Sequence, residues 1–512
     1  MKILYYNWVQ FDDLEGRGGG VTVYQRNLIE GMLKKGFDIY FLSSGLSYTI
    51  LKKETYIRPT SNIFGDRCKS FEIVNSAVPA PGHASFFMDD IVRSDRSMLQ
   101  AIERFVLENG PFDVVHFNNL EGLPLAAIDK SLFGGAQLFF SAHNYFSVCP
   151  QVNLWREESA NCIDYRHGHN CTQCLMYTPS LKQVLAAHQL SSMIKSTHKN
   201  LDREEFLQVF SRYKYILMLM RLLNTAVYIL RRGVLKNPLY SYIEKRMYKK
   251  RAKNQKFARL VGFDVRRGSY IRQIEENCSL VLAVSRRTKD VLVRAGFDER
   301  KIEVVYIGSK YADNAAKYTK RHTLKESGHL AIGYFGYMRR DKGFYFFLES
   351  MEALDERLAK KITIVVAAQD AKDGSRERLR ALMQKFRDVV YFNGYSAEDM
   401  DDIVRYIDIG VIPSLWEDNL PQVAIELVCK GIPILSSDLG GASELFESRD
   451  FTFAAGDMNA LHEKLEKLLN GDFYLSDFWL TPPRITTIER HCLEMSKLYT
   501  LQRDRFQEIS KP

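Results

Sequence analysis

Two acids stand eight positions apart at the start of a predicted helix in the second half of the chain. Asp418 lies in a loop after an apolar run, and Glu426 lies on the helix that begins near Pro421. In a sheet of parallel strands, ligands bind beyond the carboxyl ends of the strands. The backbone N–H groups around Asn419 and Leu420 have no helical partner and attract anions. This loop could therefore bind a diphosphate, and Glu426 could accept hydrogen bonds from a ribose.

A second predicted strand-to-helix loop carries positive charge. It reads Phe-Gly-Tyr-Met-Arg-Arg-Asp-Lys-Gly over residues 335–343. A lysine and an arginine that face a diphosphate can neutralise a leaving group without a metal ion. The candidates are Lys342 and Arg339, and Arg340 is the alternative to Arg339.

The first half of the chain offers two further features. Gly18, Gly19 and Gly20 follow the first predicted strand, and glycine lets the backbone approach a phosphate or an acceptor closely. His143 and His116 each stand at the end of a predicted strand. Either histidine could face a ligand, and either could instead be a buried histidine of the core.

Together these motifs resemble family 4 of the GT-B glycosyltransferases. The family signature is an acid, seven residues and a Glu, then a small-Gly-x-Pro run and a Gly-Gly pair. In this sequence Asp418 stands where the family usually has Glu, Lys430 takes the small position, and Gly440 and Gly441 supply the pair. Tyr337 stands where the family usually has Arg. The Asp-Asn-Leu-Pro form of the motif is typical of members that build surface polysaccharides.

The resemblance implies a retaining hexosyltransferase whose donor is a UDP- or GDP-sugar. Asp418 and His143 would hold the donor sugar as the catalytic residues, and Glu426 would hold the ribose. The resemblance also supplies the remaining donor-binding candidates, which are Gly18, Gly19, Gly20, Arg339, Lys342, Asn419, Leu420 and Pro421. No cofactor would be required for the chemistry. The family has no obvious protein nucleophile, and the departing phosphate is usually proposed to take the proton of the acceptor.

The elements that must position these residues form two repeats of alternating strands and helices. Such alternation predicts an α/β fold with parallel sheets covered on both faces. The resemblance implies the GT-B arrangement, in which two Rossmann-like domains face a cleft. We expect an N-terminal, acceptor-side domain over residues 1–310, a C-terminal nucleotide-sugar domain over 327–480, and a terminal helix over 481–512 that could pack back on the first domain.

Residues 146–272 fit neither repeat and are interpreted as an insertion in the first domain. Its first part contains Cys149, Cys162, Cys171 and Cys174, with a single C-x-x-C pair at the end. Four thiolates, or three with a histidine, could hold a structural zinc ion. Free thiols and a redox pair are the alternatives.

The insertion continues with an apolar run and a basic run. The apolar run over residues 215–230 contains Arg221 and is too short to predict a transmembrane helix. Between Arg231 and Arg267 there are thirteen Lys or Arg and two acids. We predict that residues 210–260 contact an anionic membrane surface. The alternative is a core helix with a solvated charged neighbour.

The net charge and the N-terminal sequence bear on the partners and the location of the protein. The net charge is +9, but it is concentrated in one segment, so we expect no nucleic-acid partner. The N-terminus has no signal-peptide pattern, which predicts a cytoplasmic protein. The segment over residues 210–260 predicts a peripheral position on the inner face of a membrane. The leading hypothesis is a transferase of surface polysaccharide or glycolipid synthesis, with a glycan or lipid-linked acceptor. A nucleotide-sugar epimerase of the same fold and a non-catalytic partner subunit are the alternatives.

Overall fold

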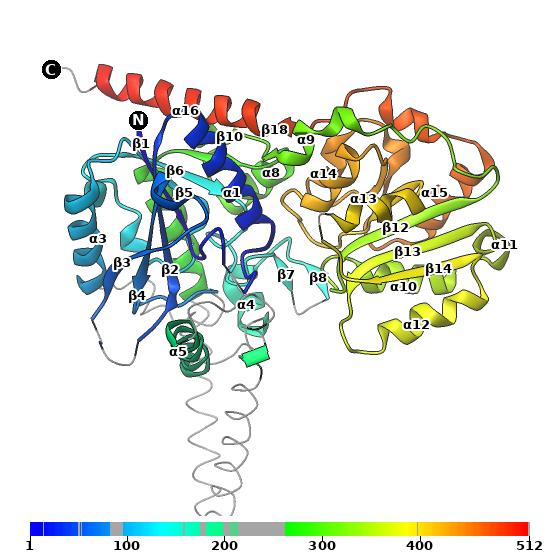
Figure 1. The fold of residues 1–512 in the computed structure, drawn as a ribbon, viewed down its shortest axis with the longest axis horizontal. Helices are drawn as coiled ribbons and strands as arrows, with labels where there is room; N and C mark the ends of the chain where they lie inside the picture. The colour runs from blue at the N-terminus through cyan, green and yellow to red at the C-terminus, as the bar shows by residue number, and fades with distance from the viewer. Residues whose placement is uncertain are drawn as a thin grey trace, which may run out of the picture.

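In the computed structural model, the described residues form two α/β domains that lie side by side (Figure 1). These residues are 1–13, 15–49, 52, 54–81, 96–156, 159–174, 181–197, 205, 208, 209, 211, 262–396 and 398–509.

The N-terminal domain is built on an eight-stranded sheet in the order β10-β9-β6-β5-β1-β2-β4-β3. All neighbouring strands are parallel except β3 and β4. Every residue of β5 and β6 is buried, as expected for inner strands with both faces covered. The strands are β1 (Lys2–Asn7), β2 (Asp38–Ser47), β3 (Tyr56–Thr60), β4 (Cys68–Val74), β5 (Val114–Phe117), β6 (Gln137–Ala142), β9 (Cys278–Ala283) and β10 (Ile302–Val304).

Helices cover this sheet, and the first of them begins in the glycine loop. Helix α1 (Gly19–Lys34) buries Tyr24, Leu28, Ile29 and Met32, whose spacing places them on one helical face. The other helices are α3 (Arg96–Asn109), α4 (His169–Cys174), α5 (Leu181–Thr197), residues 262–277 and α8 (Arg286–Ala295), and the short hairpin is β7 (Trp155–Arg156) with β8 (Ala160–Asn161).

The C-terminal domain has a six-stranded, fully parallel sheet in the order β14-β13-β12-β15-β16-β17. Its strands are β12 (Leu330–Tyr337), β13 (Ile362–Gln369), β14 (Asp388–Asn393), β15 (Ile409–Ile412), β16 (Ile434–Ser437) and β17 (Thr452–Phe453). Its helices are α10 (Phe344–Ala353), α11 (Glu356–Ala359), α12 (Ser375–Ala381), α13 (Asp399–Ile403), α14 (Gln422–Cys429) and α15 (Met458–Asn470).

The chain ends on the domain where it began. After β11 (Gly308–Ser309) and α9 (Lys310–Asp313), it builds the second domain, and β18 (Thr486–Thr487) then pairs with β11. Helix α16 (Ile488–Ile509) lies along the N-terminal domain (Figure 1). A Cβ at Gly31 of α1 would lie 2.5 Å from the Cys492 sulfur, so glycine is needed for this close packing.

The α/β fold with parallel sheets predicted from the sequence is confirmed. The apolar pattern from Lys342 to about Leu358 predicts one long helix from the sequence, but this prediction is wrong, because the structure has two helices there. The chain turns at Leu354, and Asp355 caps α11 by accepting a hydrogen bond from the Arg357 N–H. Strands β3 and β4 were not predicted; β3 contains Pro59, which an edge strand tolerates.

The end of the predicted insertion is part of the first domain's core. Phe263, Tyr270 and Ile274 are buried, and the Arg266 side chain is 2% exposed between the rings of Phe146 and Tyr270. Arg266 also donates a hydrogen bond of 2.6 Å to the Phe146 carbonyl. This arginine of the basic run is therefore a packing residue and not a surface charge.

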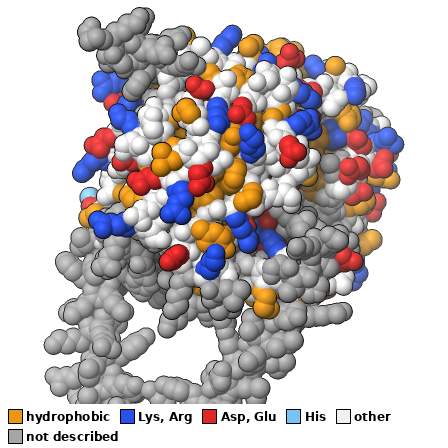
Figure 2. Space-filling model, turned by 60° about the vertical axis from the view of Figure 1, so that its left-hand side comes forward, with side chains coloured by type: hydrophobic (Ala, Val, Ile, Leu, Met, Phe, Trp, Pro, Cys, Tyr) orange, Lys and Arg blue, Asp and Glu red, His pale blue; other side chains and the backbone are white. Residues whose placement is uncertain are grey.

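Most of the proposed membrane-contacting segment lies outside the described residues, including Arg221 and everything from 212 to 261. Across the part of the chain that is described, no helix is both long enough and apolar enough to cross a bilayer. Figure 2 shows one face of the molecule, on which Lys and Arg side chains are interspersed with acids and apolar groups.

Candidate active site

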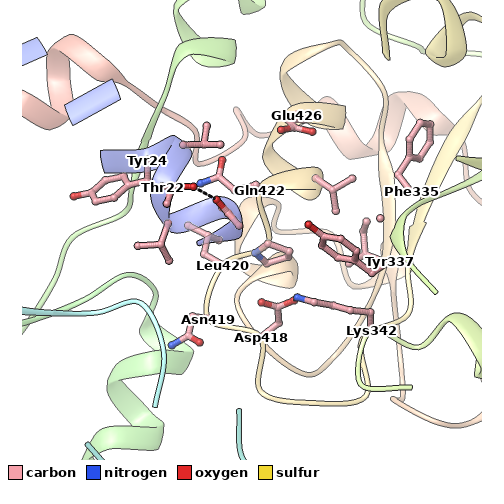
Figure 3. A pocket seen from close by; sticks show the side chains of 18 of the residues that line it. Thr22, Tyr24, Phe335, Tyr337, Lys342, Asp418, Asn419, Leu420, Gln422 and Glu426 are labelled. Carbon is pink, nitrogen blue, oxygen red and sulfur yellow. Dashed lines mark hydrogen bonds and ion pairs between the residues drawn. The ribbon is translucent and has the colours of Figure 1, made fainter. Parts of the chain in front are cut away.

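A cavity of about 840 Å³ lies between the two domains. It is lined by the glycine loop and α1 on the N-terminal side, and by the ends of β12 and β15 and the start of α14 on the other (Figure 3). Of the residues predicted from the sequence, the cavity is lined by Gly19, Gly20, His143, Lys342, Asp418, Asn419, Leu420, Pro421 and Glu426.

Asp418 and Lys342 come from different loops and form an ion pair. The Lys342 ammonium lies 2.6 Å from Asp418 Oδ2, and the two side chains point toward one another (Figure 3). Glycines make this approach possible. A Cβ at Gly343, whose φ is +75°, would lie 1.6 Å from the Pro413 carbonyl oxygen, and a Cβ at Gly440 would lie 2.4 Å from the Asp418 carbonyl oxygen.

The two arginines beside Lys342 face elsewhere. Arg339 makes a bidentate ion pair with Asp341, with distances of 3.0 and 2.6 Å. Arg340 lies over the Tyr345 ring at 5.3 Å. Neither arginine lines the cavity, whereas Tyr337, which is 56% exposed, does. Donor binding by Arg339 remains a prediction from the sequence, since its side chain pairs with Asp341 and does not line the cavity.

Glu426 lies one turn into α14, on the wall of the same cavity. Burial raises the pKa of Glu426 to about 7, while the charge of Lys430 and a hydrogen bond from Tyr311 act in the opposite direction. The Lys430 ammonium is held by Asp401 and Tyr318. Glu426 therefore titrates near neutral pH, where a bound hydroxyl could meet either form of the carboxyl group.

His143 stands at the end of β6 and lines the cavity beside Tyr24, with ring centroids 4.6 Å apart. Burial, with a smaller contribution from His491, lowers the pKa of His143 to about 3, so the ring is neutral at pH 7. When Nε2 donates to Asn118 Oδ1 at 3.2 Å, Nδ1 remains an acceptor for a ligand hydroxyl.

His116, the second strand-end histidine, belongs to the core. Its ring is fully buried, with Nδ1 2.7 Å from the Tyr499 hydroxyl and Nε2 2.8 Å from the Ser141 hydroxyl. It does not line the cavity. Of the two alternatives for these histidines, His116 is therefore the buried histidine of the core, and both of its ring nitrogens are hydrogen-bonded.

The N-termini of α1 and α14 lie close together on the cavity wall. A Cβ at Gly20 would lie 2.8 Å from Cγ of Gln422, the first residue of α14. Gly18 serves packing, because a Cβ there would lie 2.0 Å from the Thr22 methyl carbon. The Asn419 side chain turns away from α1 and donates to the Ala142 carbonyl at 3.3 Å. Unpaired N–H groups at both helix starts favour an anionic ligand between them.

The C-terminal half of this site matches a known family. Residues 329–471 match the model described as Glycosyl transferases group 1. The C-terminal domain is a group 1 glycosyl transferase domain. The matched range spans the whole six-stranded sheet and contains Lys342, Asp418 and Glu426.

Two curated relatives are named for the synthesis of capsular polysaccharide and of teichuronic acid. The capsular polysaccharide biosynthesis glycosyltransferase CapM of Staphylococcus aureus is 23% identical over 203 residues, which are 38% of this chain and 52% of CapM. The putative teichuronic acid biosynthesis glycosyltransferase TuaC of Bacillus subtilis is 27% identical over 176 residues, 33% of this chain and 41% of TuaC. The chain spans about half the length of the curated relatives it matches.

Solved structures show the fold of the whole chain. Sucrose-phosphate synthase of Thermosynechococcus elongatus has a TM-score of 0.54 and 13% identity, and the match covers 99% of this chain and 100% of that one. HepE of Anabaena, solved in complex with UDP, has a TM-score of 0.50 and 11% identity, with 99% of each chain covered. The GT-B fold is thereby confirmed.

Several cavity residues of the glycosyl transferase domain were not predicted. Gln369 ends β13, Asn393 ends β14, and Tyr395 and Trp416 follow strands in the same sheet. The rule that ligands bind beyond the carboxyl ends of parallel strands would have pointed to the first two. Tyr311 comes from the connection between the domains, and no local pattern marks it.

The four cysteines of the predicted zinc site line one small cavity of about 20 Å³, together with Arg267. Burial raises the pKa of Cys171 to about 12 and that of Cys162 to about 11, so these thiols are protonated at neutral pH. Among the described residues, no group of three or more His, Cys, Asp or Glu side chains is arranged to hold a metal ion. The zinc site remains a prediction from the sequence.

Proposed function

We propose that this chain transfers a sugar, with retention of configuration, from a UDP- or GDP-sugar to a glycan or lipid-linked acceptor. The observation that carries the proposal is the cavity between the domains, where the Lys342–Asp418 pair, the start of α14 and Glu426 share one wall. Such a wall offers a cation and free N–H groups to a diphosphate, and carboxyl groups to hydroxyls. The complex of HepE with UDP supports a nucleotide donor for this fold.

The cavity supports departure of the nucleotide assisted by fixed dipoles and one lysine. Its cationic lining residues in the described chain are Arg26 and Lys342, and its acids are Asp13, Asp418 and Glu426. Although burial opposes its ionisation, hydrogen bonds and charges from Arg17 and Lys195 lower the pKa of Asp13 to about 2. Asp13 is therefore a weak base, and Asp418 and Glu426 are assigned to hydroxyls of the donor. We accordingly propose that the departing phosphate takes the proton of the acceptor hydroxyl.

A donor screen tests this function. The full chain would be mixed with a panel of UDP- and GDP-sugars, and melting temperature and donor hydrolysis would be measured. We expect one nucleotide class to raise the melting temperature and to be hydrolysed slowly without acceptor. The proposal would be overturned if no member of the panel were bound. Binding without any turnover would favour the partner-subunit alternative.

The relatives support an acceptor in cell-surface polysaccharide synthesis. Capsular polysaccharide and teichuronic acid are the products named for CapM and TuaC, respectively. Product analysis with and without a glycan acceptor would separate transfer from epimerisation. A transferase forms a glycoside only with acceptor, and nuclear magnetic resonance of the product would show whether the anomeric configuration is retained. An epimerase would change the nucleotide sugar without acceptor.

The basic segment supports a peripheral membrane position for residues 210–260. Each basic residue near anionic lipid contributes on the order of 1 kcal/mol, and the attraction is screened by salt. We expect the intact chain to float with anionic liposomes more than a variant carrying Lys249→Glu, Lys250→Glu and Arg251→Glu. Equal flotation of both proteins with neutral and anionic liposomes would contradict the electrostatic contribution.

A further inference from the structure

The loop that carries Asp418 is anchored in the opposite domain. Trp416, two residues earlier, is 8% exposed and packs in the hydrophobic core of the N-terminal domain. Its ring makes an edge-on contact with Tyr145, with centroids 6.5 Å apart. The Lys342 ammonium lies 4.8 Å from the centre of the same Trp416 ring. The Lys342 cation therefore lies against a ring that packs in the N-terminal domain.

Glu417 is the second residue of this loop that the N-terminal domain holds, and its buried charge requires charged partners there. Its side chain is 3% exposed. Arg287 donates to its two carboxylate oxygens at 2.5 and 2.7 Å, and Arg294 donates at 3.1 Å. Both arginines lie on α8 of the N-terminal domain. A buried carboxylate is tolerated only when it is paired and hydrogen-bonded, and the bidentate geometry fixes its direction.

A third donor to Glu417 comes from the cysteine-rich loop. The Asn161 amide in β8 donates to Glu417 Oε1 at 3.2 Å. Burial would raise the pKa of Glu417, but the hydrogen bonds and charge of Arg287 lower it on balance. Glu417 thus remains ionised at neutral pH, and three N-terminal-domain side chains converge on it.

Successive side chains of this loop face opposite ways. Glu417 points to α8, Asp418 points to Lys342 in the cavity, and Asn419 points back to β6 and α8. The Asp418 N–H is 2.8 Å from the Trp416 carbonyl, so a tight turn separates the anchors from the cavity acid. A shift of Glu417 would therefore move Asp418 directly.

The same helix holds the segment at a second point. Glu444 accepts hydrogen bonds from the N–H groups of Arg286 and Arg287 at 2.9 and 2.6 Å, at the start of α8. It follows the glycine pair that contacts Asp418, since the Gly441 N–H donates to the Asp418 carbonyl at 2.8 Å. Helix α8 therefore holds the chain directly before Asp418, through Glu417, and it also holds the segment that contacts the Asp418 carbonyl, through Glu444.

We infer that Glu417 and Arg287 are an interdomain positioning pair, which holds Asp418 and Lys342 in the arrangement needed for sugar transfer. This inference rests on the proposed function. Nucleotide binding uses mainly α14 and the C-terminal sheet, whereas transfer requires both domains at the reacting centre. Loss of the pair should therefore lower kcat more than it weakens nucleotide binding.

The test compares Glu417→Gln with Glu352→Gln in the full chain. Glu352 also makes a bidentate pair, with Arg378 at 2.8 and 2.7 Å, but on an exposed surface of the C-terminal domain. We expect Glu417→Gln to lower kcat by roughly 10- to 100-fold, as displacement of a catalytic group by about 1 Å can do. The Kd for UDP or GDP, whichever the wild type binds, should change by less than about threefold, and Glu352→Gln should change neither value.

A double-mutant cycle tests whether the two residues act through each other. Arg287→Gln combined with Glu417→Gln should lose little more than the worse single variant, because either change breaks the same pair. Additive losses, or full kcat in folded Glu417→Gln, would overturn the inference. Arg287→Lys keeps the charge without the bidentate geometry and should fall between wild type and Arg287→Gln.

Hydrogen–deuterium exchange gives a readout that does not need turnover. We expect the backbone amides of the loop over residues 414–422 to exchange faster in Glu417→Gln than in wild type and in Glu352→Gln. Unchanged exchange of this loop would overturn the inference. If wild type bound no donor, the proposed function would fail, yet this difference in exchange would still test the interdomain pair.

Discussion

At the residue scale, two of the acids that line the cavity are paired with cations. Lys342 is paired with Asp418, and Asp13 is paired with Arg17 and Lys195. Binding a diphosphate would exchange the Lys342–Asp418 contact for a contact with phosphate, which would free Asp418 for the hydroxyls of a sugar. One lysine would then do what a lysine and an arginine do in the usual family pattern, because Tyr337 has no charge.

Lys342→Ala should weaken binding of the nucleoside diphosphate while the fold survives. Loss of one charge-assisted contact costs roughly 1.5–3 kcal/mol, or about 10- to 150-fold in Kd. Titration calorimetry with the nucleotide found in the donor screen would measure the change. Arg340→Ala is the matched control, since that side chain lies over Tyr345 outside the cavity. Equal affinities of wild type and Lys342→Ala would remove Lys342 from the site.

Glu426→Gln should change how stability depends on pH. The folded-state pKa of about 7 exceeds the ordinary value of 4.5, so the folded protein binds more protons than the unfolded chain between these values. The wild type should therefore lose stability relative to Glu426→Gln as pH rises from about 4.5 to about 7, by roughly 3 kcal/mol.

Urea unfolding of both proteins at pH 5 and pH 8 would measure this difference. Glu466→Gln, an exposed change on α15, is the control. A constant difference between wild type and Glu426→Gln across the window would show that the carboxyl group ionises as easily in the folded chain as in the unfolded one.

At the element scale, the site is made where strands end and helices begin. Strand β6 of the N-terminal sheet and strands β12, β13, β14 and β15 of the C-terminal sheet end at the cavity, and α1 and α14 begin there. The cysteine-rich loop after β6 lies outside the cavity; it contains the β7–β8 hairpin and α4, and its carbonyls accept hydrogen bonds from Arg266 and Arg267 of the helix over residues 262–277. A metal ion would supply the cross-link that a short loop of this kind otherwise lacks.

Protein purified without chelator should contain about one equivalent of zinc if the four thiols bind it as predicted. Burial raises the pKa of Cys171 to about 12, so zinc added to chelator-treated protein should displace protons from thiols. Elemental analysis and proton release would be measured for wild type, Cys171→Ser and Cys68→Ser, a change at a buried cysteine outside the loop. No zinc in the wild type, together with full activity of Cys171→Ser, would contradict the prediction.

At the scale of the whole molecule, the last helix, α16, packs against the N-terminal domain and hydrogen-bonds to its β5 and α1. Tyr499 of α16 is fully buried and hydrogen-bonds His116 of β5, and His491 of α16 lies 2.9 Å from the Tyr24 hydroxyl of α1. Burial lowers the pKa of His116 well below its usual range, so a neutral ring is held between Tyr499 and Ser141. The C-terminus thereby supports the N-terminal half of the cleft.

Tyr499→Phe should lower stability by roughly 1–3 kcal/mol, because it leaves a buried His116 nitrogen without its partner. Denaturant unfolding would measure the loss. Tyr406→Phe is the control, since Tyr406 is 56% exposed in the C-terminal domain. If both variants were equally stable, the Tyr499–His116 hydrogen bond would contribute nothing measurable to the fold.

The sequence by itself determined most of the parallel strands, the helices that flank them and the local motifs. Strand and helix periods depend on neighbouring residues, and so do glycine loops and the spacing of Asp418 and Glu426. Contacts between residues distant in the chain were decided by tertiary structure alone: Lys342 meets Asp418, and His116 belongs to the core while His143 faces the cavity. The anchoring of Glu417 on α8 was equally hidden, because its partners lie more than 100 positions away. Such contacts depend on how two folded domains are oriented, and no local pattern records that orientation.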